Sequence, residues 1–330
     1  MTTLRPLPTG RPARIAVLDD YMGVAHRMAD WSVLDETAEV TFLREAIAPD
    51  RLIEELAPYD AISLMRERTP MPGSVLQALP NLKAIATTGR QTRTLDTDAA
   101  SDLGIAIMTT DGSGNGIYAT VELAWGLIIG LMRHIPGEHN EMREGAWQVQ
   151  LGSALYGRTL GLVGLGRLGS RMASIAEAFG MNVIAWSPNL TPERAREGGA
   201  EFVEKSVLFE TADIVSLHLV LGPTTKGIVG MEDIERMRPD ALLINTSRGP
   251  LIDRDALLDA LQNGRIRGAG IDVYDHEPLP ADDPIRKARN VLTTPHLGYC
   301  VQETFESFYG QTVANLRSWL DGDLHDDASA

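Results

Sequence analysis

Three glycines near the middle of the chain have the spacing that binds a dinucleotide. Gly164, Gly166 and Gly169 form the pattern G-x-G-x-x-G between a short apolar run at 159–163 and a helical pattern at 168–179. Gly164 permits a tight turn, Gly166 lets the backbone approach a pyrophosphate, and Gly169 lets the helix pack against the strand. The first N–H groups of that helix can hold phosphate oxygens. A glycine-rich turn of any other α/β protein is the alternative, but the flanking strand and helix favour a dinucleotide site.

Three downstream segments resemble the D-isomer-specific 2-hydroxyacid dehydrogenase family. The first reads M-R-P-D-A-L-L-I-N-T-S-R-G and carries Arg248, the second reads G-I-D-V-Y-D-H-E-P and carries Glu277, and the third reads T-P-H-L-G and carries His296. The glycine motif precedes all three, and a G-A-W segment at 145–147 precedes the glycine motif. Four motifs in this order are more specific than any one of them. The resemblance covers most of the chain from about Leu82 onward.

The resemblance implies an NAD(P)-dependent oxidoreductase that acts on CH–OH donors and interconverts a 2-keto acid and a D-2-hydroxy acid. Arg248 offers a planar fork for carboxylate and carbonyl oxygens. His296 can exchange the proton of the carbonyl oxygen, because an unperturbed histidine has a pKa of about 6.5, and Glu277 can orient its other ring nitrogen. From the residues alone, Asp275 is an alternative partner for the histidine, and each residue could be an ordinary surface or loop group. Their shared context predicts a catalytic set of Arg248, Glu277 and His296.

The choice between NAD and NADP depends on the segment after the second strand of the cofactor domain. Ser187 stands 21 residues after Gly166, where NAD-binding domains usually carry Asp or Glu. Without that carboxylate a 2′-phosphate is not repelled, and Ser187, Asn189 and Thr191 can donate hydrogen bonds to it. Arg194 either adds positive charge or faces water, so the segment favours NADP slightly and leaves NAD open. The expected cofactor contacts are Gly164, Gly166, Arg167, Leu168, Gly169, Ser187, Asn189, Thr191, His218, Thr225, Thr246, Ser247, Arg248, Asp272, His296, Gly298 and Thr120.

Candidates for substrate contacts lie in two loops of the amino-terminal half and directly after the histidine motif. Gly89, Arg90 and Gln91 match in position the family loop whose backbone amides receive the substrate carboxylate. The family pattern has a second glycine there, so Arg90 and Gln91 indicate a substrate with an additional polar or anionic group. Arg66 corresponds to another loop near the family's cleft, and Tyr299 could close the pocket, although all of these could be plain loop residues. The expected substrate-binding set is Arg66, Gly89, Arg90, Gln91, Arg248, His296 and Tyr299.

Alternating strand and helix patterns must position these residues. Runs of strand length occur at 14–18, 40–43, 61–64, 83–87 and 105–108, and again at 160–163, 182–186, 214–218, 241–245, 268–273 and 291–293. Helical patterns separate them, and the longest covers 117–143. This alternation predicts parallel sheets with helices on both faces. Ligands of such folds bind at the carboxyl ends of the strands.

We expect two doubly wound parallel-sheet domains of the α/β class, with a cleft between them. A flavodoxin-like substrate domain is expected to be discontinuous, with residues 1–116 plus 297–330, and a Rossmann dinucleotide-binding domain to span 117–296. The last helix is expected at 301–320, and the acidic tail at 321–330 to be disordered. The resemblance also implies a homodimer that is supported by the long central helix and the segment after it.

Charge and composition exclude several classes of partner. The 330 residues contain 30 Lys+Arg and 45 Asp+Glu, and the net charge of −15 repels nucleic acid and anionic membranes. The most apolar stretch, 121–132, is shorter than the roughly 20 residues of a membrane-spanning helix. Cys300 is the one cysteine, which fits a reducing cytoplasm, and the amino terminus lacks an apolar signal segment. No spacing of histidine and cysteine indicates a metal site.

Other functions are compatible with the same motifs. Phosphoglycerate, phosphite and formate dehydrogenases belong to the same superfamily, and Arg248, Glu277 and His296 do not separate them. A non-enzymatic dinucleotide-sensing binding protein is an alternative of a different class, against which the intact catalytic set argues. We therefore expect a small 2-keto or 2-hydroxy acid as the partner molecule.

Overall fold

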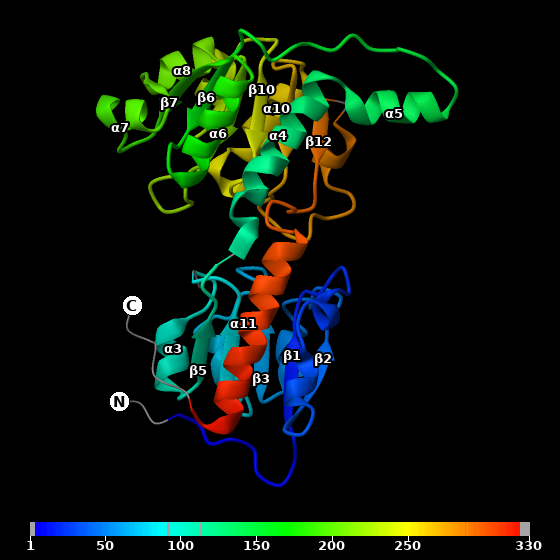
Figure 1. The fold of residues 1–330 in the computed structure, drawn as a ribbon, viewed down its shortest axis with the longest axis vertical. Helices are drawn as coiled ribbons and strands as arrows, with labels where there is room; N and C mark the ends of the chain where they lie inside the picture. The colour runs from blue at the N-terminus through cyan, green and yellow to red at the C-terminus, as the bar shows by residue number, and fades with distance from the viewer. Residues whose placement is uncertain (1–3, 91–92, 113, 289, 324–330) are drawn as a thin grey trace. The chain divides into compact units, whose positions relative to one another are not determined.

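The computed structural model describes residues 4–90, 93–112, 114–288 and 290–323. The chain divides into two units (Figure 1). The first contains Met1–Ile117 and Val301–Ala330, and the second contains Tyr118–Cys300. The expected disordered tail falls largely outside the described residues, as does Gln91 of the expected substrate loop.

The first unit is built on a parallel five-stranded sheet with the order β2-β1-β3-β4-β5. Every residue of β3 and β4 is buried, which explains why these strands read as continuous apolar runs. The strands are β1 (Ala13–Val17), β2 (Ala38–Phe42), β3 (Ala61–Leu64), β4 (Ala84–Thr87) and β5 (Ala106–Thr109). The helices are η1 (Ala25–Arg27), η2 (Trp31–Leu34), α1 (Leu52–Leu56), α2 (Gly73–Gln77), α3 (Thr97–Asp102) and α11 (Gln302–Asp321).

Helix α11 returns to the first unit from the far end of the sequence and packs on β4, β5 and η2 (Figure 1). Its buried residues recur at helical spacing along one face. They include Phe305, Phe308, Tyr309, Leu316 and Trp319.

The second unit has a parallel seven-stranded sheet with the order β12-β11-β10-β9-β6-β7-β8. Helices α4 and α6 cover one face, while α8, α9 and α10 pack against the other. The strands are β6 (Thr159–Val163), β7 (Asn182–Trp186), β8 (Glu201–Phe202), β9 (Ile214–Leu217), β10 (Leu242–Asn245), β11 (Gly268–Ile271) and β12 (Val291–Thr293). The helices are η3 (Gly114–Tyr118), which crosses the boundary between the units, α4 (Ala119–Met132), α5 (Ile135–Arg143), α6 (Arg167–Ala178), α7 (Pro192–Glu197), α8 (Lys205–Thr211), α9 (Met231–Arg236), η4 (Gly249–Leu251), α10 (Arg254–Gln262) and η5 (Pro284–Lys287).

The prediction of one long helix over 117–143 is wrong, because the chain bends between α4 and α5. His134 adopts a left-handed backbone conformation with φ 53°. Pro136 follows in the first turn of α5, where its missing N–H is tolerated, whereas inside one continuous helix it would remove a hydrogen bond. Helix α4 is largely buried, whereas α5 has no buried residue and extends away from the sheet in Figure 1.

Among the described residues, no single helix has the length and apolar character of a membrane span. Gly116–Met132 and Ile135–Arg143, which are bent by 60°, meet those criteria only as a pair and only by length and composition.

Matching aspartates support the first strand of each sheet. In the first unit, Asp60 donates its backbone N–H to Arg14 O (2.8 Å) and accepts Arg14 N–H on its carboxylate (2.9 Å). In the second unit, Asp213 makes the same two bonds to Thr159, at 2.9 and 2.8 Å. Each aspartate directly precedes the strand that pairs with the first strand, so one side chain connects two neighbouring strands at their amino ends.

Candidate active site

The glycine motif forms the predicted turn between β6 and α6. Gly164 has φ 103°, and a Cβ at this position would lie 2.8 Å from the carbonyl carbon and oxygen of His218. A Cβ on Gly169 would collide with the carbonyl oxygen of Gly164. A Cβ on Gly166 would meet no described residue within 4 Å other than its neighbours along the chain, so the space beside this residue is open. Two glycines are therefore required by packing, and the third leaves room for a ligand against the backbone.

The amino end of α6 can receive an anion. Gly166 is its N-cap residue and makes no side-chain cap, so the first N–H groups of this 12-residue helix depend on other acceptors. Arg167 is exposed at the first helical position, while Leu168 packs against the core. This cradle fits the pyrophosphate of a dinucleotide.

Polar side chains after β9 and β10 shape the same edge of the sheet. His218 shares a hydrogen bond of 2.9 Å with Ser216 through its Nε2, and burial lowers the pKa of His218 to about 4. Its ring is therefore neutral near pH 7. Thr246 is buried, and its hydroxyl oxygen has no hydrogen-bond partner among the described residues. This free hydroxyl at the carboxyl end of β10 suits a polar group of a bound cofactor.

Several other expected cofactor contacts use their hydroxyls to hold loops together. Thr120 donates to Gly298 O (2.7 Å), and Ser247 donates to Leu219 O (2.6 Å). Thr225 Oγ1 donates to Val220 O (2.7 Å) and accepts the N–H of Gly222. These side chains fix the backbone of the loops that they join.

The segment after β7 contains no carboxylate between Ser187 and Thr191. Thr191 caps α7 by accepting Arg194 N–H at 3.3 Å. The Arg194 guanidinium bends back and donates to Asn189 O at 3.1 Å. The arginine therefore lies over the segment that the sequence assigns to the ribose, rather than pointing away from it.

The three expected catalytic residues follow three neighbouring strands. Arg248 comes after β10, Glu277 after β11, and His296 after β12. His296 Nδ1 lies 2.5 Å from Glu277 Oε2, and about a fifth to a quarter of each side chain is exposed. The structure thus pairs His296 with Glu277, not with the alternative, Asp275. The N–H of Tyr274 donates to the other carboxylate oxygen of Glu277 at 2.9 Å.

The backbone of His296 is held in a left-handed conformation with φ 53°. Its N–H donates to Asp272 O at 2.8 Å. The buried Asp272 carboxylate accepts the N–H groups of Leu297 (2.7 Å) and Gly298 (2.9 Å) and the hydroxyl of Thr294 (2.6 Å). Burial raises the pKa of Asp272, and these hydrogen bonds oppose the rise. One aspartate therefore shapes the whole histidine loop.

These bonds also correct the expected domain boundary. Residues 297–300 were expected in the substrate domain, but they belong to the second unit, which extends to Cys300. Asp272 of this unit holds the amides of 297 and 298, so the chain leaves the unit only after that loop.

The side chain of Asn245, at the end of β10, holds the backbone of the Arg248 loop by hydrogen bonds. Asn245 Nδ2 donates to Arg248 O (2.9 Å), and its Oδ1 accepts Ser247 N–H (3.0 Å). Gly249 follows, where a Cβ would collide with the backbone of Tyr274. The arginine loop and the glutamate loop therefore pack backbone against backbone.

The expected substrate residues of the first unit are not all brought together. Arg66 has φ 56°, donates its N–H to Thr88 Oγ1 (2.9 Å), and places its guanidinium where a Cβ of Gly89 would be. Arg90 instead forms an exposed ion pair with Asp111 at 2.7 Å. In the second unit, the ring of Tyr299 meets the ring of His296 edge-on, with centroids 5.4 Å apart.

Two residues that sequence reasoning did not select are central to this geometry. Asn245 holds the backbone of Arg248, and Tyr274 holds Glu277. In the sequence, Asn245 is noticeable only as an amide at the end of an apolar strand, and Tyr274 only as a tyrosine inside the glutamate motif. Neither signal specifies a contact across loops that are distant in sequence.

Comparisons with known proteins agree with this arrangement. A family model described as "D-isomer specific 2-hydroxyacid dehydrogenase, NAD binding domain" matches residues 125–298. The chain is 33% identical over 302 residues to a glyoxylate reductase of Korarchaeum cryptofilum, with 89% of this chain and 90% of that protein covered. It is 35% identical over 314 residues to a D-3-phosphoglycerate dehydrogenase of Synechocystis, where 94% of this chain matches 54% of the relative. The chain thus spans about half the length of that dehydrogenase.

A solved structure of another protein has the same fold as this chain. A phosphoglycerate oxidoreductase from Vibrio cholerae superimposes with a TM-score of 0.87 and 36% sequence identity, and the match covers 94% of this chain and 99% of that one. With its glycine turn and its Arg248, Glu277 and His296 loops, the chain belongs to the D-isomer-specific 2-hydroxyacid dehydrogenase family.

Proposed function

We propose that the chain interconverts a 2-keto acid and a D-2-hydroxy acid with a nicotinamide dinucleotide. The observation that carries this proposal is the His296–Glu277 pair, which lies at the same sheet edge as Arg248 and the open glycine turn. Acid–base, anion-binding and dinucleotide-binding groups are thereby combined in one unit. A protein that only senses a dinucleotide has no use for such a proton-transfer pair.

The residues have separate tasks in this reaction. The nicotinamide, when bound, supplies or accepts the hydride. Glu277 holds Nδ1 of His296 in its protonated form, so Nε2 is the atom that delivers a proton to the carbonyl oxygen or removes it from the hydroxyl. Arg248 binds the substrate carboxylate through its planar fork.

For the substrate we propose a 2-hydroxy acid with a second anionic or polar group. Support comes from Arg66, whose guanidinium lies at Gly89 in the loop assigned to the substrate. The names of the glyoxylate reductase and phosphoglycerate dehydrogenase relatives are compatible with this class.

A panel of 2-keto acids tests the function directly. Turnover should be measured with glyoxylate, pyruvate, hydroxypyruvate and 3-phosphohydroxypyruvate, each with NADH and with NADPH. We expect oxidation of one reduced dinucleotide per keto acid, and a higher kcat/KM for a substrate with a second anionic group. The absence of turnover from the whole panel, with a dinucleotide still bound, would favour the binding-protein alternative.

For the cofactor we propose a modest preference for NADP. Support comes from the missing carboxylate after β7 and from the position of Arg194 over Asn189. Replacing Ser187 with Asp should lower the ratio of kcat/KM for NADPH over NADH, because the new carboxylate repels a 2′-phosphate and accepts from a ribose 2′-hydroxyl. An unchanged ratio would mean that this segment does not contact the ribose.

We further propose a cytoplasmic homodimer that uses α5 and the segment after it. The support is a run of exposed apolar side chains, with Trp147 75%, Leu151 95% and Tyr156 82% exposed. Light scattering of the Leu151→Asp variant tests the dimer, which this charge should weaken. A monomeric wild-type protein would contradict the proposed homodimer.

The proposed cytoplasmic location is supported by the single cysteine, which fits a reducing compartment.

A further inference from the structure

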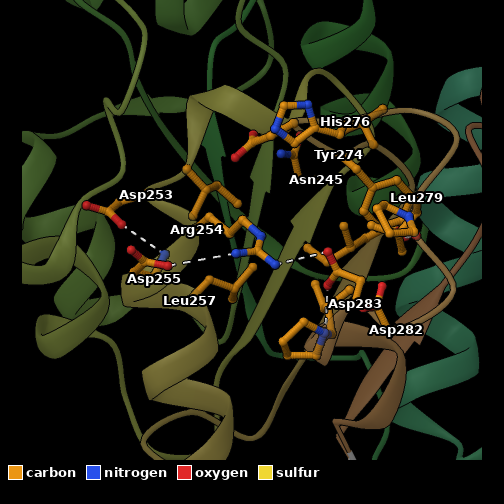
Figure 2. Close-up of a pocket in the computed structure, with 18 residues that line it drawn as sticks. Asn245, Asp253, Arg254, Asp255, Leu257, Tyr274, His276, Leu279, Asp282 and Asp283 are labelled. Carbon is orange, nitrogen blue, oxygen red and sulfur yellow. Dashed lines mark hydrogen bonds and ion pairs between the residues drawn. The ribbon is translucent and has the colours of Figure 1, made fainter. Parts of the chain in front are cut away.

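A cavity of about 570 Å³ opens in the second unit, between the start of α10 and the loop that carries Glu277 (Figure 2). Its volume lies within the roughly 300–1,000 Å³ that small-ligand sites occupy. The side chains of Arg248, Glu277 and His296 do not line it. It is therefore a different space from the site of the proposed reaction.

The inner wall of this cavity is apolar. Side chains from β11, from the end of η4, from α10, from η5 and from the loop before η5 form it: Ile252, Leu257, Ile271, Leu279 and Ile285. Such a wall favours a ligand with an aliphatic body, because contact removes apolar surface from water on both sides.

The remaining lining is strongly acidic. Five aspartates line the cavity against one arginine, which leaves a formal charge of −4 with histidine neutral. The arginine does not offer a free cation, because Arg254 donates to Asp283 at 2.9 Å and lies 3.9 Å from Asp255 (Figure 2). Asp275 and Asp282 line the cavity and are exposed to solvent. The charge therefore favours a cation and disfavours the anionic substrates of the active site.

Two residues of the cavity wall also position the catalytic loops. Asn245 donates to the backbone oxygen of Arg248 at 2.9 Å. Tyr274 donates its N–H to Glu277 at 2.9 Å and its hydroxyl to Thr294 O at 2.9 Å, at the start of the histidine loop. Burial raises the pKa of Tyr274, so this hydroxyl remains a donor at neutral pH. A molecule in the cavity would thus contact groups that hold all three catalytic loops.

We propose that this cavity binds a small organic cation with an aliphatic body, of the alkylammonium class, and that its occupancy changes turnover through Asn245 and Tyr274. The binding part is independent of the proposed reaction. The regulatory part rests on the proposed function.

Binding is tested by calorimetry on the full chain with n-hexylammonium as the probe. Hexanol and hexanoate, which share the aliphatic body, serve as neutral and anionic controls. We expect saturable binding of the ammonium, weaker binding of the alcohol and none of the carboxylate. The double variant Asp275→Asn/Asp282→Asn should weaken ammonium binding about three- to tenfold, the range for two partly exposed charge pairs.

A matched variant separates a local effect from a change in overall charge. Glu232→Gln removes an exposed carboxylate of α9 that does not line the cavity, and it should leave the dissociation constant unchanged. Absence of saturable binding, or equal weakening by Glu232→Gln, would overturn the site.

Turnover then tests the regulatory part. Saturating hexylammonium should change kcat for the best keto acid at least twofold in wild type, and it should act at higher concentration in the double variant. Binding without any effect on kcat would overturn the coupling and leave the site standing. Failure of the keto-acid panel would contradict the proposed function and leave the calorimetry unaffected.

Discussion

His296 occupies a backbone conformation that non-glycine residues rarely adopt. Hydrogen bonds hold this strained backbone in place. The N–H of His296 donates to the backbone oxygens of Asp272 and Thr294, and the Thr294 hydroxyl donates to the Asp272 carboxylate. Glu277 then fixes the ring through Nδ1. Orientation of the imidazole is therefore determined by backbone and side chain together, which is what a positioned proton donor requires.

Replacing His296 with Asn should reduce kcat about 10²- to 10⁴-fold, the usual range for positioned acid–base catalysis. Dinucleotide affinity should remain near wild type, because the glycine turn is not altered. Steady-state kinetics and fluorescence titration of the reduced cofactor measure the two quantities. Near-normal turnover in a folded variant would remove His296 from the proton-transfer role.

Arg248→Lys keeps the charge but loses the planar fork. A point ammonium cannot make two parallel hydrogen bonds to a carboxylate, so kcat/KM should fall sharply while cofactor affinity is nearly unchanged. The comparison is made with the best keto acid from the panel. If both KM and kcat stay at wild-type levels, the arginine has only a structural role.

Among the secondary-structure elements, the glycine turn joins β6 to α6 through contacts too short for side chains. A Cβ on Gly169 would collide with the Gly164 carbonyl oxygen, whereas a Cβ on Gly166 would meet no described residue within 4 Å other than its neighbours along the chain. One position is therefore closed by the protein itself, and the other is open.

These two positions give a matched pair of variants. Gly169→Ala should lower the melting temperature, because overpacking of this kind costs about 1–3 kcal/mol. It should also weaken dinucleotide binding, because the turn that receives the pyrophosphate must shift. Gly166→Ala should weaken binding with little effect on the melting temperature. Equal thermal destabilisation by both substitutions would contradict the open space assigned to Gly166.

The sequence was informative where one element alone determines the structure. The glycine spacing, the apolar runs of the buried strands and the last helix were all predictable. The left-handed conformation of His134 was not, because the helical pattern carries no signal for it, although Pro136 marks a helix boundary in the sequence. Likewise the choice of Glu277 over Asp275 depends on how two loops meet, which residue spacing within one loop does not specify.

At the scale of the whole molecule, each unit has an aspartate at the amino end of its sheet, and that of the first unit is buried. The Asp60 side chain is fully buried and pairs with Arg11 and Lys83, each at 2.7 Å. Burial raises the pKa of Asp60, but hydrogen bonds from Arg11 and Lys83 outweigh it, so the pKa lies below its ordinary value. The ionised carboxylate therefore stabilises the folded first unit.

Asp60→Asn should lower the free energy of unfolding by about 3 kcal/mol at pH 7, as expected when a buried pair loses one partner. The contribution of Asp60 is complete above its unfolded pKa of about 3.9 and is lost as the pH falls through the lower folded pKa. Urea titrations at pH 7 and below pH 4 should therefore show the difference between the two proteins shrinking in acid. Asp240→Asn, at an exposed pair with Arg238, is the control and should change stability by less than about 0.5 kcal/mol. A pH-independent difference for Asp60→Asn would contradict the role of its charge.

The return of α11 to the first unit has a consequence for how the protein is made. During translation β1–β5 emerge first, but the helix that covers β4 and β5 emerges only after all of Tyr118–Cys300. The second unit is continuous and can complete its sheet while the first still lacks Phe305, Phe308 and Trp319. Until α11 has emerged from the ribosome, the nascent first unit therefore exposes the apolar surface that these rings cover in the folded protein.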